Sequence, residues 1–135
     1  MPAPRIEKLL GPAKRELFKA LRAYNNVAIR KSDYRAFAVT IRDRGKIAGG
    51  LVAETYFGWM FVNVLWVSEQ HRRKGWGRSL MQKAEAEARK RGVRKVWLDN
   101  YSINEPFYAK LGYREFGRLE DFPDGLDRVW MTKAL

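Results

Sequence analysis

The sequence predicts an α+β fold in which a twisted, mostly antiparallel sheet with flanking helices contains one central strand–helix–strand crossover. An apolar segment, residues 60–67, precedes a glycine-rich turn and a helical pattern over residues 77–91, and this helix leads to a second apolar segment, residues 93–99. Hairpin patterns lie on both sides of this crossover in the sequence. Strands and helices mixed in this order are typical of a single α+β domain.

The elements before the crossover are a helix and a hairpin. Pro12 is suited to the first turn of the helix, and apolar residues follow at helical spacing, namely Leu17, Phe18, Leu21 and Tyr24. Residues 37–41 and 47–55 are strand-like and are joined by the turn sequence Asp43-Arg44-Gly45-Lys46. Residues 60–67 are apolar almost throughout, which predicts a central strand covered on both faces.

The elements after the crossover are shorter. Gly92 is suited to end the crossover helix, because a residue just past a helix end often adopts a left-handed backbone. Residues 106–111 predict a short helix closed by a glycine. Two final strands, residues 113–120 and 127–133, are expected on either side of the turn at residues 122–125.

Length and composition exclude several classes of protein. The chain has 135 residues, no cysteine, one histidine and a net charge of +12, so we expect one domain over residues 1–135. Disulfides and thiolate nucleophiles are excluded, and we expect no metal site. The start of the chain lacks the apolar run of a signal peptide, and the most apolar window, residues 56–67, is too short to span a bilayer. We therefore expect a soluble cytoplasmic protein without membrane contact.

The positive charge is concentrated near the crossover. Residues 72–95 contain ten basic and two acidic side chains, whereas residues 115–127 are mainly acidic. A surplus of this size fits nucleic acid, an anionic membrane surface or a polyanionic nucleotide cofactor, and it also fits a solvated basic surface.

The turn Arg72-Arg73-Lys74-Gly75-Trp76-Gly77 lies between a strand and a helix. Amides at a helix N-terminus lack intrahelical partners and carry positive potential, so such a turn can bind phosphate. Leu80 stands where a dinucleotide fingerprint needs its third glycine, and Arg72 stands where a Walker loop needs its first. A turn that only joins strand to helix is the alternative.

These residues resemble the GNAT superfamily of acyl-CoA-dependent N-acetyltransferases, whose loop pattern is Gln/Arg-x-x-Gly-x-Gly/Ala. A second resemblance lies downstream, because Phe107-Tyr108-Ala109-Lys110-Leu111-Gly112-Tyr113 is similar to the family's Phe-Tyr-x-Lys-Leu-Gly-Phe/Tyr. The likeness extends loosely over residues 17–135 and suggests a small bacterial-type member.

The resemblance implies that acetyl-CoA is the cosubstrate. In the family, two neighbouring strands splay apart, the pantetheine arm pairs with one of them, and the diphosphate lies on the loop amides. The cofactor-binding residues implied here are Leu65, Trp66, Val67, Arg72, Arg73, Lys74, Gly75, Trp76, Gly77, Arg78, Asn104 and Lys110. His71 lies beside the arginines, where a role in loop structure or cofactor contact is expected.

The resemblance also implies catalytic roles. Tyr108 matches the family's general acid, and an amide near Trp66 or Val67 is expected to stabilise the oxyanion. Asn63 stands where many relatives carry an acid, so Glu54, Glu69 and Asp99 are the candidates for the base, directly or through water. Direct transfer in a ternary complex needs neither Cys nor a second His.

The expected acceptor is a small cationic amine or a Lys-rich peptide. The acidic residues Glu120, Asp121 and Asp124 near the last hairpin could attract it. Two other functions stay open: an acyl-CoA sensor without transferase activity, and a basic nucleic-acid or ribosome-associated protein. The second is disfavoured because most tryptophans lie in predicted strands or turns rather than on an exposed basic strip. A homodimer is also compatible with the resemblance.

Overall fold

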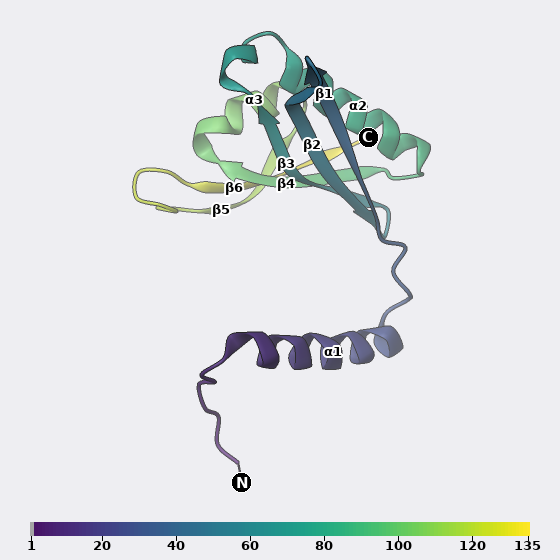
Figure 1. Cartoon of the computed structure of the whole chain (residues 1–135), viewed down its shortest axis with the longest axis vertical. Coiled ribbons are helices and arrows are strands. Elements are labelled where there is room, and N and C mark those ends of the chain that lie inside the picture. The colour runs from purple at the N-terminus through teal and green to yellow at the C-terminus, as the bar shows by residue number, and fades with distance from the viewer. Residues whose placement is uncertain (1) are drawn as a thin grey trace. The chain divides into compact units, whose positions relative to one another are not determined.

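The computed structural model describes residues 2–135, which form two compact units divided between Ser32 and Asp33. The first unit contains helix α1 (Leu10–Ala28), with Pro12 in its first turn as expected (Figure 1). α1 carries an apolar stripe that includes Leu17 and Leu21. No helix within residues 2–135 is long and apolar enough to cross a membrane.

The second unit contains one sheet with helices and short 3₁₀ turns. Its elements in chain order are β1 (Arg35–Asp43), β2 (Lys46–Tyr56), β3 (Trp59–Val67), η1 (Glu69–His71), α2 (Trp76–Lys90), β4 (Lys95–Tyr101), η2 (Ser102–Asn104), α3 (Glu105–Lys110), β5 (Arg114–Leu119) and β6 (Arg128–Ala134).

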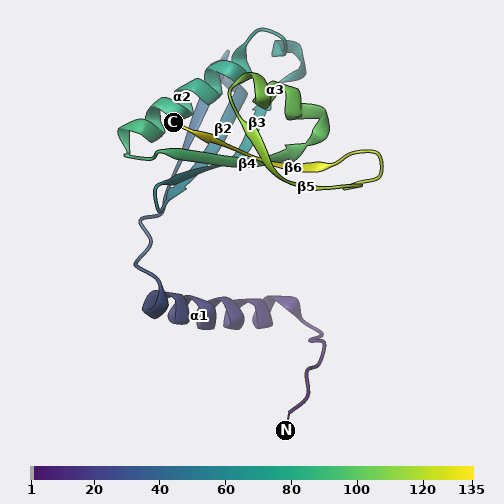
Figure 2. The same cartoon turned by 180° about the vertical axis from the view of Figure 1, so that it is seen from behind.

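The six strands lie in the order β1-β2-β3-β4-β6-β5, and β2 to β6 are labelled in Figure 2. Every neighbouring pair is antiparallel except β3 and β4, which are parallel and are connected through α2. The predicted α+β fold with its central crossover is confirmed. The insertion of β6 between β4 and β5 is a tertiary feature that no local pattern indicates.

The core of the second unit lies between α2 and the sheet. Leu80, Met81, Ala84 and Ala88, the predicted apolar face of α2, are all buried. They pack with buried side chains of the central strands, including Leu51, Met60, Val96 and Met131. Each large aliphatic side chain buried here contributes about 1.5–3 kcal/mol, so α2 is held firmly against the strands that carry the site.

The ladder between β3 and β4 is short. It runs only from Trp59↔Lys95 to Phe61↔Trp97, where the two rings stack with centroids 4.1 Å apart. Just beyond it, Asn63 is the extra residue of a β-bulge against β2, because Val64 pairs with Val52 and Val62 with Ala53. Bulges bend a strand and end pairing, so β3 leaves β4 at this point.

The second half of β3 therefore has an unpaired edge. The prediction that this strand is covered on both faces is wrong for this half, because Val64 and Trp66 are 48% and 46% exposed. A strand that borders an opening can have the same continuous run of apolar residues as a strand that is covered on both faces. The sequence alone does not distinguish these two kinds of strand.

Candidate active site

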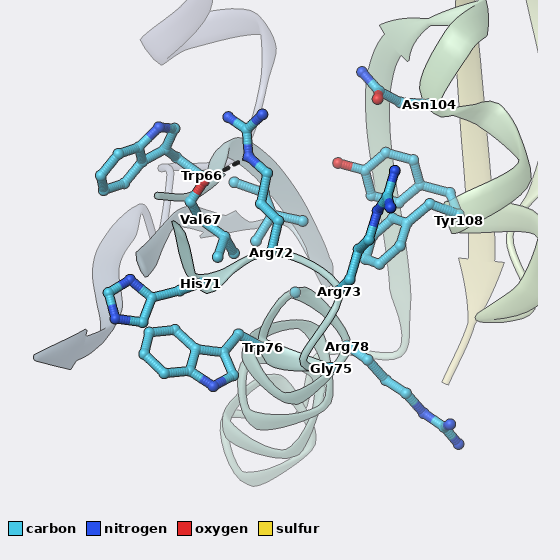
Figure 3. Close-up of a pocket in the computed structure, with 13 residues that line it drawn as sticks. Trp66, Val67, His71, Arg72, Arg73, Gly75, Trp76, Arg78, Asn104 and Tyr108 are labelled. Carbon is cyan, nitrogen blue, oxygen red and sulfur yellow. Dashed lines mark hydrogen bonds between the residues drawn. The ribbon is translucent and has the colours of Figure 1, made fainter. Parts of the chain in front are cut away.

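The second unit contains a cavity of about 660 Å³. It lies between the end of β3, the loop that follows, the first turn of α2 and the side chains of α3 (Figure 3). Its lining consists of Leu65, Trp66, Val67, His71, Arg72, Arg73, Gly75, Trp76, Gly77, Arg78, Asn104, Phe107 and Tyr108. We call it the loop cavity.

The unpaired edge of β3 offers backbone groups to the loop cavity. The Ser68 backbone N–H donates to the Ala48 carbonyl on β2 at 2.8 Å. Because backbone groups alternate in direction along a strand, those of Trp66 also face β2, and those of Leu65 and Val67 face the unpaired edge. Arg72 Nε donates to the Val67 carbonyl at 3.0 Å (Figure 3). The Val67 N–H faces the unpaired edge, where it can donate to a ligand.

The first turn of α2 borders the same cavity. Gly75 is the N-cap residue, with φ of 79°, and no side chain caps the helix. The free N–H groups of this turn are therefore available to an anion. Gly77 lets the Phe107 ring pack closely against this turn, because a Cβ atom there would lie 3.1 Å from Phe107 Cζ. Arg73, close in sequence to Gly75, also has a positive φ, 63°, and a left-handed non-glycine residue costs about 1–2 kcal/mol.

His71 fixes the loop that carries these residues. It is 8% exposed, its Nδ1 is hydrogen-bonded to Ser68 Oγ, and its Nε2 lies 3.0 Å from Asp43 Oδ2. Its ring stacks on Trp76 with centroids 4.4 Å apart. Both ring nitrogens and one ring face are thus occupied, so His71 supports the loop while its remaining surface lines the cavity.

A second, smaller cavity lies in the opening between β3 and β4. It measures about 270 Å³ and contains mainly polar side chains from the two strands and from β6. Its lining consists of Val62, Asn63, Val64, Leu65, Leu98, Asp99, Asn100, Tyr101, Asn104, Tyr108 and Arg128. We call it the strand cavity. Leu65, Asn104 and Tyr108 line both cavities, so the two meet at these residues.

Tyr108 is the titratable residue at this junction. Its hydroxyl group points toward the β3 side of the loop cavity (Figure 3). Burial raises the pKa of Tyr108 above its ordinary value of 10.0, and the Asp99 carboxylate raises it further. The phenol therefore stays protonated at neutral pH and can donate a proton, but it cannot act there as a base.

The predicted cofactor-binding residues all line the loop cavity except Lys74 and Lys110. Lys74 lines a different cavity beside Asp43 and His71, and Lys110 lines another with Arg78 and Arg89. The cavity with Lys110 is lined by several basic residues. Arg78 lines both this cavity and the loop cavity, so the two adjoin there.

The predicted catalytic acids lie in different places. Asp99 lines the strand cavity with Tyr108. Glu54 accepts a hydrogen bond from the Tyr34 hydroxyl at 2.6 Å and lines neither cavity. The predicted acceptor-binding residues, Glu120, Asp121 and Asp124, are exposed on the connection between β5 and β6 and also line neither cavity.

Residues 4–113 match the model of the Acetyltransferase (GNAT) family. The chain belongs to this family. The sequence-based prediction of a GNAT enzyme, an acyl-CoA-dependent acetyltransferase, is thereby confirmed.

Similar proteins include several acetyltransferases. An acetyltransferase of Agrobacterium fabrum is 35% identical over 127 residues, which cover 90% of this chain and 93% of that protein. A blasticidin-S acetyltransferase of Streptomyces morookaense is 35% identical over 69% of this chain and 70% of its own length. The crystal structure of an acetyltransferase from Bacillus cereus matches with a TM-score of 0.89 and 31% identity, over 98% of each chain.

Sequence reasoning missed most of the strand cavity. Asn63, Asn100, Tyr101 and Arg128 come from three strands whose order is set by tertiary pairing. The one available signal was the cluster of polar residues at the end of the strand after α2. Among residues 2–135, no group of three or more His, Cys, Asp or Glu side chains is arranged to hold a metal ion.

Proposed function

We propose that this GNAT enzyme transfers an acetyl group from acetyl-CoA directly to a primary amine in a ternary complex. The observation that carries the proposal is the junction of the two cavities at Leu65, Asn104 and Tyr108. A thioester entering from the loop cavity and an amine entering from the strand cavity would meet there, beside a phenol that keeps its proton.

The loop cavity suits acetyl-CoA in shape and chemistry. The backbone of Val67 at the unpaired edge of β3 would pair with the amide groups of the pantetheine arm, as a neighbouring strand does. The free amides around Gly75, together with Arg73, would receive the diphosphate. Arg78 and Lys110 would approach the adenosine phosphate, because they line the adjoining basic cavity.

The reaction needs three groups from the chain: a donor to the oxyanion, a general acid and an acceptor for the amine proton. The amine nitrogen attacks the thioester carbonyl carbon, and the developing oxyanion would accept a hydrogen bond from an edge-facing amide of β3. Leu65 is the best placed, since it lines both cavities, whereas Trp66 directs its amide at β2. When the C–S bond breaks, Tyr108 would give its proton to the leaving thiolate, and the proton that the newly bonded nitrogen loses would restore the phenol through solvent.

The amine must lose a proton to react. An alkylamine with a pKa near 10.4 is less than about 0.1% unprotonated at pH 7. We propose that Asp99 receives this proton through solvent in the strand cavity, because it lines that cavity with Tyr108. Glu54 is bonded to Tyr34 away from the junction, which does not support a direct role.

Release of CoA with a panel of amines tests the proposal. The assay detects the free thiol and, by mass spectrometry, the acetylated amine. We expect CoA release that depends on the amine. If the protein binds acetyl-CoA but none of the amines causes CoA release, the protein is a sensor and the proposal is wrong.

Three broader features remain proposals. We propose that residues 1–135 act as one catalytic domain in the cytoplasm, and that the carboxylates Glu120, Asp121 and Asp124 act on the ammonium group of an acceptor from a distance and not by contact. We also propose a homodimer, in which the apolar stripe of α1 that includes Leu17 would be the contact surface. Light scattering with and without Leu17→Glu would test the dimer.

A further inference from the structure

In the strand cavity, Asp99, the proposed proton acceptor, is paired with an arginine that acetyl transfer itself does not require. Arg128 on β6 donates from Nη2 to Asp99 Oδ1 on the neighbouring strand β4. Both side chains are partly exposed, 25% for Arg128 and 18% for Asp99, and both line the cavity beside Tyr108. The pair is therefore reachable from the place where the acceptor would bind.

Arg128 is held in one orientation. Its guanidinium lies 4.6 Å from the centroid of the Tyr101 ring, which lines the same cavity. A guanidinium has five N–H donors, and the contact with Asp99 uses one of them. A fixed guanidinium whose other N–H donors can bind a ligand is the usual arrangement for recognising a carboxylate.

The charge of this cavity argues against an acceptor that is only cationic. Asp99 could attract an ammonium group, but Arg128 would repel it at nearly the same position. An acceptor that carries an amine and an anionic group close together would satisfy both residues, since each end would face its opposite charge.

The size of the strand cavity suits a small acceptor. Its volume is about 270 Å³, and a free amino acid fits a volume of this order. Val64 and Leu65 supply apolar walls for a side chain.

From these observations we propose that the acceptor is a small amino-carboxylate, such as a free α-amino acid, whose amine faces Asp99 and whose carboxylate binds Arg128. This assignment rests on the proposed transferase function and names its substrate class. Arg128 is then a substrate-binding residue that sets specificity, in addition to linking β4 and β6.

Paired acceptors test the assignment. Leucine and leucinamide, and alanine and alaninamide, differ in the carboxylate and, as a result, in the pKa of the amine, so each kcat/KM is expressed per unprotonated amine. Putrescine represents a plain diamine. A hydrogen bond between charged groups is worth about 10- to 100-fold in affinity. We expect wild-type kcat/KM to be higher by this factor for each amino acid than for its amide.

Substitution of Arg128 should remove this preference. In Arg128→Met we expect the ratio between amino acid and amide to fall close to one, mainly through a higher KM for the amino acid. Arg128→Lys keeps a point charge without the planar fork, so an intermediate ratio is expected. Arg94→Met is the matched control, because Arg94 is exposed and lines neither cavity.

The ratio is measured within one preparation, so partial unfolding of a variant does not change it. CoA affinity by calorimetry checks that the loop cavity is intact. If wild type uses amides or putrescine as well as amino acids, or if Arg128→Met lowers all rates equally, the assignment is overturned and the transferase function stands. If no amine releases CoA, both proposals are overturned.

Discussion

The ring of Phe107 packs on the backbone of Gly77, so closely that a Cβ atom at position 77 would lie 3.1 Å from Cζ and 3.3 Å from Cε1. This contact joins the first turn of α2 to α3, which carries Tyr108. The glycine thus serves the site in two ways: it leaves the anion-binding turn open, and it sets the position of the helix that carries the proposed acid.

Enlarging Gly77 should therefore lower turnover through Phe107. Gly77→Ala requires Phe107 to move by only a few tenths of an ångström, and we expect kcat to fall by at most about tenfold. Gly77→Val requires a larger shift, and a misplacement of about 1 Å can cost about 100-fold. Steady-state kinetics with calorimetry of CoA binding measure both effects. A wild-type kcat in Gly77→Val would show that this contact does not position the acid.

Gly75 should respond through its backbone instead. Its φ is 79°, and a Cβ atom there would meet nothing within 4 Å, so only conformational strain opposes a side chain. We expect Gly75→Ala to lower the free energy of unfolding by about 1–2 kcal/mol and to weaken CoA binding. Gly75→Asn should cost less, because Asn tolerates the left-handed region.

Gly58 provides the control for this prediction. It has the same φ of 79° and the same open surroundings, but it lies in the turn between β2 and β3 and lines neither cavity. Urea unfolding should show a similar loss for Gly58→Ala, while CoA affinity stays at the wild-type value. If both variants lost the same CoA affinity, the loss would come from lower overall stability, and backbone strain at Gly75 would have no specific effect on binding.

The pH dependence of the reaction should lack a descending limb below pH 10. The pKa of Tyr108 is raised by burial and by Asp99, so the proton-donating form persists below pH 10 and is lost only as the pH rises further. The reactive amine becomes more abundant over the same range. The pH profile of kcat/KM should therefore rise from pH 7 to about 10. A fall in that interval that disappears in Tyr108→Phe would contradict the assignment.

The sequence predicted the elements that local patterns determine. The apolar face of α2, the glycine loop and the aromatic pair at positions 107 and 108 are each specified by spacing within a few residues. For this reason most residues that line the loop cavity are among the predicted cofactor-binding residues. The exceptions, Lys74 and Lys110, are basic residues whose side chains reach other cavities.

The strand cavity could not be predicted in the same way. Asp99 and Arg128 are 29 residues apart in sequence and become neighbours only because β6 inserts between β4 and β5. Long-range pairing of this kind leaves no periodic signal in either strand. The local excess of acidic residues near positions 120–124 suggested an acceptor site, but these residues lie on an exposed connection outside both cavities.

A buried network beside the site should govern stability at high pH. Glu85 on α2 is 4% exposed and accepts hydrogen bonds from the Tyr113 hydroxyl at 2.7 Å and from Lys133 Nζ at 2.9 Å. Burial and the Glu85 carboxylate raise the pKa of Tyr113 far above its ordinary value of 10.0. Because the folded state holds this proton more tightly, its contribution to stability is full below pH 10 and declines as the pH rises further.

Tyr113→Phe should reveal this contribution. Removing the hydroxyl leaves the Glu85 carboxylate with Lys133 alone, and we expect a loss of about 1–3 kcal/mol in the free energy of unfolding at pH 7. The decline in stability above pH 10 should be smaller than in the wild type. Tyr24→Phe, on the exposed surface of α1, should change neither quantity. Unchanged urea unfolding in Tyr113→Phe would show that this hydrogen bond adds nothing to stability.

The junction of the two cavities at Tyr108 is tested most directly by Tyr108→Phe. The measurement is the rate of CoA release at saturating acetyl-CoA and amine, with the dissociation constant of CoA determined on the same preparation. General acid catalysis contributes about 10²- to 10⁴-fold, so kcat should fall by a factor in this range while CoA affinity is unchanged. A variant that retains the wild-type kcat would contradict the proposal that the acetyl group is transferred beside this phenol.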